Sequence, residues 1–201
     1  NELKKTGKPI AMVLFTGRPL ALTNVKDVPD AMLNVWFSGT EAGHAIADVL
    51  FGKVNPSGKL PVTFPRSLGQ VPIYYNHKNT GRPLSAEKTD KCEYDRFRAN
   101  YMDECNTPLY PFGYGLSYTS FTYSDMSVSN TNPKGNQTVQ VSVNLKNSGN
   151  YDGAEVVQLY IRDLVGSITR PVKELKGFQK VFLKKGESKK VTFNITPEDL
   201  K

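Results

Sequence analysis

The chain has 201 residues and a formal net charge of +7, with 38% hydrophobic and 22% charged residues. This length allows one large or two small domains with enough apolar sequence for a core. No run approaches the roughly 18 apolar residues of a membrane helix, so we expect no membrane span. The sequence opens without Met on a polar stretch that resembles a helix end, and we expect it to be a piece of a longer polypeptide.

The positive charge is concentrated near the C-terminus, in a segment that also reads as two strands. The lysines there are Lys173, Lys176, Lys180, Lys184, Lys185, Lys189 and Lys190. Lysines along an exposed sheet edge discourage pairing with another sheet, and no nucleic-acid-binding signature accompanies them. We interpret them as a solvated edge and expect no nucleic-acid partner.

Two cysteines, Cys92 and Cys105, lie in a polar segment. Their spacing is not a zinc pattern, and His44 and His77 are distant in sequence, so no metal site and no cofactor are expected. A disulfide between them could contribute roughly 3 kcal/mol in the loop-entropy model. It would require an oxidising compartment; two unrelated free thiols are the alternative.

The N-terminal part reads as mixed strand and helix. Pro9–Thr16 is a continuous apolar run that favours a strand buried on both faces of a parallel sheet, and Ala31–Phe37 is a second short run. A helical apolar stripe follows. Its expected start is a capping box with Ser38 as N-cap and Glu41 three residues on, and Gly52 stands where a helix C-cap belongs.

The middle of the chain lacks periodicity. Residues 66–108 are polar and turn-rich, and a loop of this length is either functional or docked on another part of the protein. Leu109–Phe121 interleaves aromatic residues with Pro111, Gly113 and Gly115, which forbid a regular helix. We interpret this stretch as a joint between domains, with an aromatic loop over a core as the alternative.

From Phe121 onward the period becomes two. Val139, Val141, Val143 and Leu145 alternate with polar residues, as in a half-buried antiparallel strand. Similar runs separated by polar turns follow, which indicates an immunoglobulin- or fibronectin-type β-sandwich. We count about five strands where such a sandwich has around seven, so we expect it to be incomplete.

Several motifs occur in a fixed order along the chain. They are Gly17–Leu20, Trp36–Gly43, Ala47–Gly52, Asn55–Pro61, Phe64–Pro65, Asn79–Pro83, Tyr110–Tyr118 and Arg170–Phe178. Together they resemble the C-terminal part of glycoside hydrolase family 3, most closely its periplasmic β-glucosidases. The insertion that carries the two cysteines fits the family less well.

The resemblance implies a barrel, then an α/β sandwich, then a fibronectin type III-like domain. The expected fold is therefore α/β plus all-β. Residues 1–72 would be the C-terminal part of the α/β sandwich, 73–117 an inter-domain connector, and 118–201 an incomplete fibronectin type III-like domain.

The resemblance also implies where the chemistry lies. Retaining glycosidases use two carboxyl groups about 5–5.5 Å apart, and in this family the nucleophilic Asp and the acid/base Glu come from sequence upstream of this chain. We therefore expect no catalytic residue here. Glu41, with its capping position, and Asp48, inside the same helix, are interpreted as structural residues.

His77 and Arg82 are the candidates for substrate contact, because they lie in a long polar loop and a guanidinium can hydrogen-bond sugar hydroxyls or bridge domains. The alternative is a loop pinned to its own domain. Trp36 could face a sugar ring, but a lone Trp at a strand end is more often part of a core.

These observations predict the C-terminal part of a retaining, exo-acting β-glucosidase-like enzyme, periplasmic or extracellular, that is inactive as an isolated fragment. Its expected partners are β-glucosides or oligosaccharides and the N-terminal barrel of the same polypeptide. The alternative is a stand-alone immunoglobulin-like binding or adhesion module, against which the strand-and-helix layer from Pro9 to Pro65 argues. An unfinished sandwich also leaves strand edges unpaired, so the isolated chain should be marginal or self-associating.

Overall fold

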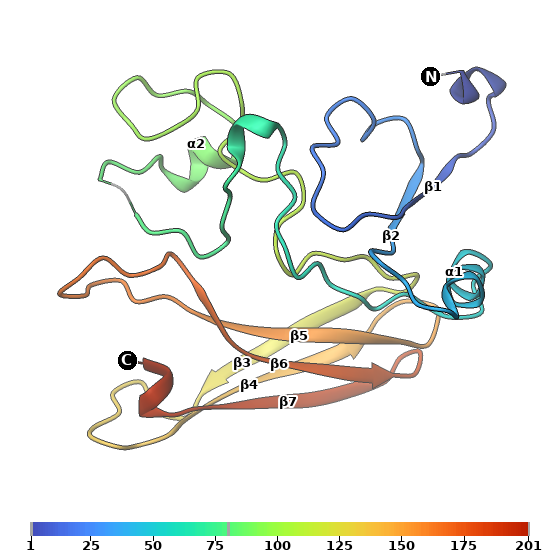
Figure 1. The fold of residues 1–201 in the computed structure, drawn as a ribbon. Coiled ribbons are helices and arrows are strands. Elements are labelled where there is room, and N and C mark those ends of the chain that lie inside the picture. Colours follow the sequence, from blue (N-terminus) through green and yellow to red (C-terminus); the bar gives the residue numbers. More distant parts are fainter. Residues whose placement is uncertain (1, 80, 201) are drawn as a thin grey trace. The chain divides into compact units, whose positions relative to one another are not determined.

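The computed structural model describes residues 2–79 and 81–200. It divides the chain into two compact units (Figure 1). The α/β unit comprises the residues up to Phe51 together with Leu60–Tyr114, and the sandwich unit comprises Gly52–Lys59 together with the chain from Gly115 onward. The chain therefore enters the sandwich unit briefly, returns to the α/β unit, and enters the sandwich unit a second time.

The α/β unit contains two short parallel strands and a few short helices. Strands β1 (Ala11–Leu14) and β2 (Ala31–Asn34) pair in parallel, as their continuous apolar runs predict. Their side chains are exposed or only half-buried among the described residues, so the expected burial on both faces is not seen within this chain. The helices are η1 (Leu3–Thr6), α1 (Ala42–Leu50), η2 (Leu68–Gln70) and α2 (Ala86–Asp90).

The predicted start of helix α1 is wrong. Its N-cap is Glu41, which makes no side-chain capping hydrogen bond, and the Ser38 hydroxyl instead donates to the Val35 carbonyl over 2.9 Å. The Ser38 hydroxyl is therefore bonded within the turn after β2 and does not form the capping box. The predicted end of the helix is confirmed, because Gly52 directly follows the C-cap residue Phe51 and itself has a left-handed φ of 76°.

The sandwich unit contains five strands among the described residues, as the alternation predicts. These are β3 (Phe121–Val128), β4 (Val139–Asn147), β5 (Gly153–Ile161), β6 (Glu174–Leu183) and β7 (Ser188–Ile195), followed by η3 (Pro197–Leu200). They form a three-stranded sheet in the order β3-β4-β7 and a two-stranded sheet of β5 and β6, with antiparallel pairing throughout.

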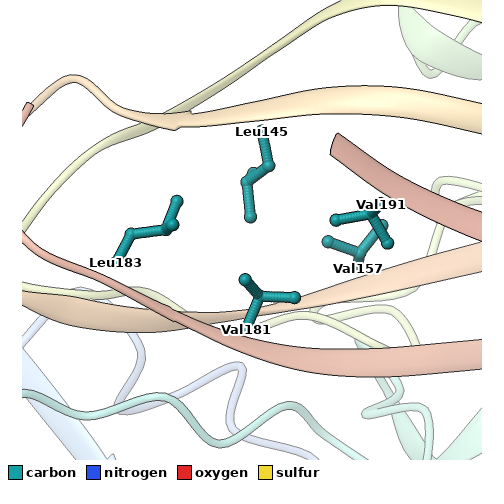
Figure 2. Packing of buried hydrophobic residues seen from close by; sticks show 5 residues of the cluster. All are labelled: Leu145, Val157, Val181, Leu183 and Val191. Carbon is teal, nitrogen blue, oxygen red and sulfur yellow. The ribbon is translucent and has the colours of Figure 1, made fainter. Parts of the chain in front are cut away.

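The core of the sandwich unit lies between its two sheets. Figure 2 shows five aliphatic side chains that point toward one another from β4, β5, β6 and β7: Leu145, Val157, Val181, Leu183 and Val191. Leu145 and Leu183 have no exposed surface. Each of these residues belongs to the alternating apolar set of its strand, so period-two patterning positions the core.

A buried polar residue closes one end of this core. Asn147 is completely buried at the end of β4; its Oδ1 accepts from the Thr119 hydroxyl over 2.7 Å, and its Nδ2 donates to the carbonyls of Tyr151 and Leu183. Its amide is therefore satisfied on both sides, as burial requires.

The lysines of the C-terminal segment lie on β6, on β7 and in the turns beside them. All are exposed except Lys176, which is half-buried. Both strands stand at the edge of their sheet, so the interpretation as a solvated edge is confirmed. Among the described residues, no helix has the length and apolar character needed to cross a membrane.

Candidate functional site

The aromatic stretch is paired with the proline-flanked segment that follows α1. Phe64 N–H donates to the Tyr110 carbonyl over 2.8 Å, and Leu109 N–H donates to the Phe64 carbonyl over 2.9 Å. The Phe64 ring is 2% exposed and lies 5.8 Å from the Trp36 ring and 6.2 Å from the Tyr110 ring. Trp36 is half-buried, and its ring belongs to an aromatic cluster with Phe64 inside the α/β unit.

A buried glutamine holds the long polar segment in place. The Gln70 side chain is 1% exposed; its Oε1 accepts from the Arg66 N–H over 2.6 Å, and its Nε2 donates to the Cys105 carbonyl over 2.7 Å. The Arg66 guanidinium in turn donates to the Thr107 carbonyl over 2.9 Å. Buried polar groups paired in this way fix backbone that has no sheet or helix partner.

The cysteines close a loop that is further fixed by asparagine side chains. Cys92 and Cys105 form a disulfide with a Cα–Cα distance of 4.6 Å. Within the loop, Asn100 Nδ2 donates to the Asp95 carbonyl over 2.7 Å. Just beyond Cys105, Asn106 Oδ1 accepts from the N–H of Tyr101 in the loop over 3.0 Å. These amide groups replace the backbone ladder of a regular element.

An ion pair ties the same loop to helix α2. Lys88 Nζ lies 2.8 Å from Asp95 Oδ2. This hydrogen bond, together with one from the Phe97 N–H, lowers the pKa of the Asp95 carboxyl, and the Asp95 carboxylate raises the pKa of Lys88. Both groups are partly solvated, so the pair positions the loop rather than creating a reactive carboxyl.

The two candidate contact residues are exposed, and the backbone of Arg82 is bonded to this loop. His77 is exposed, with Nδ1 3.3 Å from the Lys78 carbonyl oxygen. Arg82 is exposed and has a left-handed φ of 46°, and its carbonyl accepts from the Ala99 N–H over 3.0 Å, beside the bridge between Pro83 and Ala99. Within residues 2–79 and 81–200, no hydrogen bond or ion pair joins the two side chains.

The disulfide loop encloses a hollow of about 330 Å³ that the sequence reasoning missed. Part of its lining is apolar and part acidic: Tyr94, Tyr101, Met102, Glu93, Asp103 and Glu104. Carboxylates accept hydrogen bonds from hydroxyl groups, and aromatic rings offer flat apolar faces. The sequence signal that could have revealed this half-open hollow is the pair of tyrosines between the cysteines, Tyr94 and Tyr101.

Glu41 and Asp48, the two carboxylates interpreted as structural, lie at the start of α1 and within it. Glu41 is exposed at the start of α1, and Asp48 is half-buried within that helix. In the part of the chain that the structure describes, no group of three or more His, Cys, Asp or Glu residues could hold a metal ion.

Lys59, Glu155 and Tyr123 form a cluster of titratable side chains in the sandwich unit. Lys59 Nζ lies 3.0 Å from Glu155 Oε2 and donates to the Gly115 carbonyl over 2.8 Å. The Tyr123 hydroxyl donates to Glu155 Oε1 over 3.1 Å. Burial, and then the Glu155 charge, raise the pKa of Tyr123. Both Glu155 carboxylate oxygens are thus engaged, one by the Lys59 ammonium and one by the Tyr123 hydroxyl, which ties Lys59 and Tyr123 to β5.

Comparison with known proteins gives the class of this chain. Residues 1–118 match the glycosyl hydrolase family 3 C-terminal domain, and residues 155–201 match the fibronectin type III-like domain. The chain belongs to glycoside hydrolase family 3. The predicted fold class, α/β followed by a fibronectin type III-like sandwich, is confirmed by these matches.

Individual relatives match almost the whole chain. A periplasmic β-glucosidase of Salmonella typhimurium is 55% identical over 199 residues, which cover 99% of this chain and 25% of that protein. A putative β-xylosidase of Formosa agariphila is 45% identical over 200 residues, covering 100% of this chain and 24% of that protein. A β-glucosidase from Listeria innocua, solved in complex with isofagomine, superposes with a TM-score of 0.92 at 45% identity, over 98% of this chain and 27% of that one. The chain thus spans about a quarter of the length of these relatives.

Proposed function

We propose that the polypeptide carrying this chain is a retaining, exo-acting β-glucosidase-like hydrolase that removes terminal β-linked glucose. The observation that carries the proposal is the 55% identity to a periplasmic β-glucosidase over 99% of the chain. β-Xylosidases are also among the relatives, so the competing substrate to test is a β-xyloside.

In this proposal the nucleophilic Asp and the acid/base Glu lie in an N-terminal barrel outside these 201 residues. The chain itself is scaffold: residues 1–72 complete an α/β sandwich, 73–117 connect the domains, and 118–201 form the fibronectin type III-like domain. The half-buried position of Asp48 within α1 supports a structural role for it, whereas Glu41 lies at the helix start without the capping hydrogen bond expected of it.

The contacts with substrate come from the rim, through His77 and Arg82. Both side chains are exposed, and a guanidinium offers several hydrogen-bond donors to sugar hydroxyls. The backbone beneath Arg82 is fixed to Ala99 inside the disulfide loop, which supports a positioning function because a fixed donor loses less entropy on binding.

The proposed location is periplasmic or extracellular. The disulfide between Cys92 and Cys105 supports it, because such bonds persist in oxidising compartments. The periplasmic relative supports it as well.

The test compares the 201-residue chain with the full polypeptide on nitrophenyl β-glucoside and β-xyloside. The full polypeptide should release nitrophenol, faster from the glucoside, and the chain alone should release none after host glycosidases are removed. Turnover by the chain alone would overturn the assignment of catalysis to the N-terminal part. Replacement Arg82→Ala in the full polypeptide should raise KM more than it lowers kcat, and unchanged kinetics would remove Arg82 from the rim.

A further inference from the structure

The loop between β5 and β6 ends in a cluster of exposed aliphatic side chains. Leu164 is 78% exposed, Val165 is 91% exposed and Ile168 is 66% exposed. Figure 1 shows this loop projecting beyond the ends of its two strands. Single exposed apolar residues are ordinary on protein surfaces, but three within five residues at one tip form a patch. We call Leu164, Val165 and Ile168 the hairpin tip.

The hairpin tip stands on a loop with its own polar contacts. Asp163 Oδ1 accepts from the Val165 N–H over 3.2 Å, and Asp163 Oδ2 lies 3.9 Å from Arg170 Nε. Gly166 is packed so closely that a Cβ there would lie 3.0 Å from the Ile168 carbonyl oxygen. The turn is therefore compact and held by its own polar contacts, and its aliphatic side chains are exposed.

The outer face of β6, which belongs to the same hairpin, also carries exposed apolar side chains, unlike the outer face of the opposite sheet. On β6, Phe178 and Phe182 are 67% and 61% exposed, whereas Val181 between them is buried in the core. By strand alternation both phenylalanines face away from the sandwich. The outward positions of β4 and β7 are polar, and all but the buried Ser142 are at least partly exposed: Gln140, Ser142, Asn144, Lys146, Ser188, Lys190, Thr192 and Asn194. The outer face of β4 and β7 is thus polar, whereas the outer face of β6 carries two large apolar side chains, Phe178 and Phe182, with Lys180 between them.

We propose that the hairpin tip seats against an apolar, carboxylate-rimmed surface of the same polypeptide outside these 201 residues. This inference rests on the proposed function, in which a barrel precedes the chain. The chain spans about a quarter of its relatives' length, so most of the surface that could cover the tip lies elsewhere. The charged residues of the loop that carries the tip are Arg162, Asp163, Arg170 and Lys173, and Arg170 lies next to Asp163. The loop is therefore net positive, which favours an acidic rim on the partner surface.

The first test is hydroxyl-radical footprinting of the full polypeptide, with Val165 compared to Val128. The two residues have the same intrinsic reactivity, and Val165 is the more exposed within this chain, at 91% against 43%. If the tip is seated, Val165 is labelled more slowly than Val128, and its rate does not change on dilution. Labelling of Val165 as fast as Val128 or faster overturns the inference. Protection that disappears on dilution shows that a second copy of the chain covers the tip, which also overturns it.

The second test is the substitution Val165→Asp, with Met126→Asp as the control at a residue that is 75% exposed on β3. A carboxylate at a tip in water costs little, whereas one pressed against an apolar, acidic surface must be desolvated. We expect Val165→Asp alone to speed the labelling of Leu164 and Ile168 in the full polypeptide. Equal labelling in both variants contradicts seating. Glucoside hydrolysis is assayed on the same samples. An active full polypeptide whose tip is labelled freely refutes only this inference. An inactive full polypeptide whose tip is protected from labelling refutes only the proposed function.

Discussion

The two units of this chain are held together by different kinds of interaction. The sandwich unit buries Leu145, Val157, Val181, Leu183 and Val191 between two sheets. In the α/β unit the buried apolar side chains among the described residues are Leu22 and Phe64, and the long segment from 66 to 108 relies on Gln70, asparagine side chains and a disulfide. Apolar burial tolerates small shifts, whereas a polar contact fails when one partner is removed. The conformation of the α/β unit, where the candidate contact residues lie, therefore depends on a few specific hydrogen-bonding side chains and one disulfide.

The largest effect is expected in the sandwich core. Replacement Leu145→Ala removes a side chain with no exposed surface and should cost about 2–5 kcal/mol, because the surrounding sheets fill the cavity only partly. Hydrogen exchange of β4 and β7 measures the loss. Replacement Val128→Ala, at a half-exposed position of the same unit, is the matched control, and equal losses would show that the core does not stabilise this unit.

Removal of the disulfide should come next. Replacement of Cys92 and Cys105 by serine opens the covalent loop and so raises the conformational entropy of the unfolded state, which should cost about 3 kcal/mol of local stability. Limited proteolysis between residues 92 and 105 measures it. Wild-type protein treated with reductant should be cleaved at the same rate as the double variant. Resistance of the variant to cleavage would mean that the asparagine contacts alone hold the loop.

The buried glutamine is expected to follow. Replacement Gln70→Leu keeps the size of the side chain but leaves the Arg66 N–H and the Cys105 carbonyl without their partner. The cost should be about 1–3 kcal/mol for the groups left unpaired. Replacement Gln70→Glu separates the two contacts, since a carboxylate still accepts from Arg66 and no longer donates to Cys105. If both variants match the wild type in hydrogen exchange at residues 105–107, the glutamine does not fix this segment.

The smallest effect concerns Tyr123 and appears at high pH. Its pKa is raised in the folded state, so the folded protein holds this proton more tightly than the unfolded chain. The stabilisation is complete below the ordinary tyrosine pKa of about 10 and is lost as pH rises above it. Replacement Tyr123→Phe should cost about 0.5–1.5 kcal/mol at neutral pH and should flatten the fall in stability above pH 10. A fall of equal steepness in the variant would assign the pH dependence to other groups.

Much of the fold follows from local patterning. Alternation of Val139, Val141, Val143 and Leu145 predicts β4 and its core face, and the apolar runs predict the parallel pair of β1 and β2, because both signals come from side chains within one element. The capping box at Ser38 failed because a neighbouring carbonyl, at Val35, competes for the same hydroxyl. The bulge in β3 at Asp125, with its φ of 52°, left no sign in the pattern.

The site was less predictable than the fold. The hollow in the disulfide loop depends on contacts such as Gln70 to Cys105, which join residues 35 positions apart. No local period encodes such a contact. The exposed positions of His77 and Arg82 are compatible with rim contacts, and their binding to sugar remains a prediction for the kinetic test.

The early excursion of the chain through Gly52–Lys59 affects how this protein can be cut or recombined. Asn55 Nδ2 donates to the Asp152 carbonyl over 3.0 Å, Lys59 pairs with Glu155, and Gly115 packs so close to Gly58 that no side chain fits between them. A fragment that begins at Gly115 lacks all three contacts, and its Glu155 carboxylate has lost the Lys59 ammonium. The sandwich unit is thus encoded by two separate segments of the sequence, and a chimera that includes this unit must contain both segments.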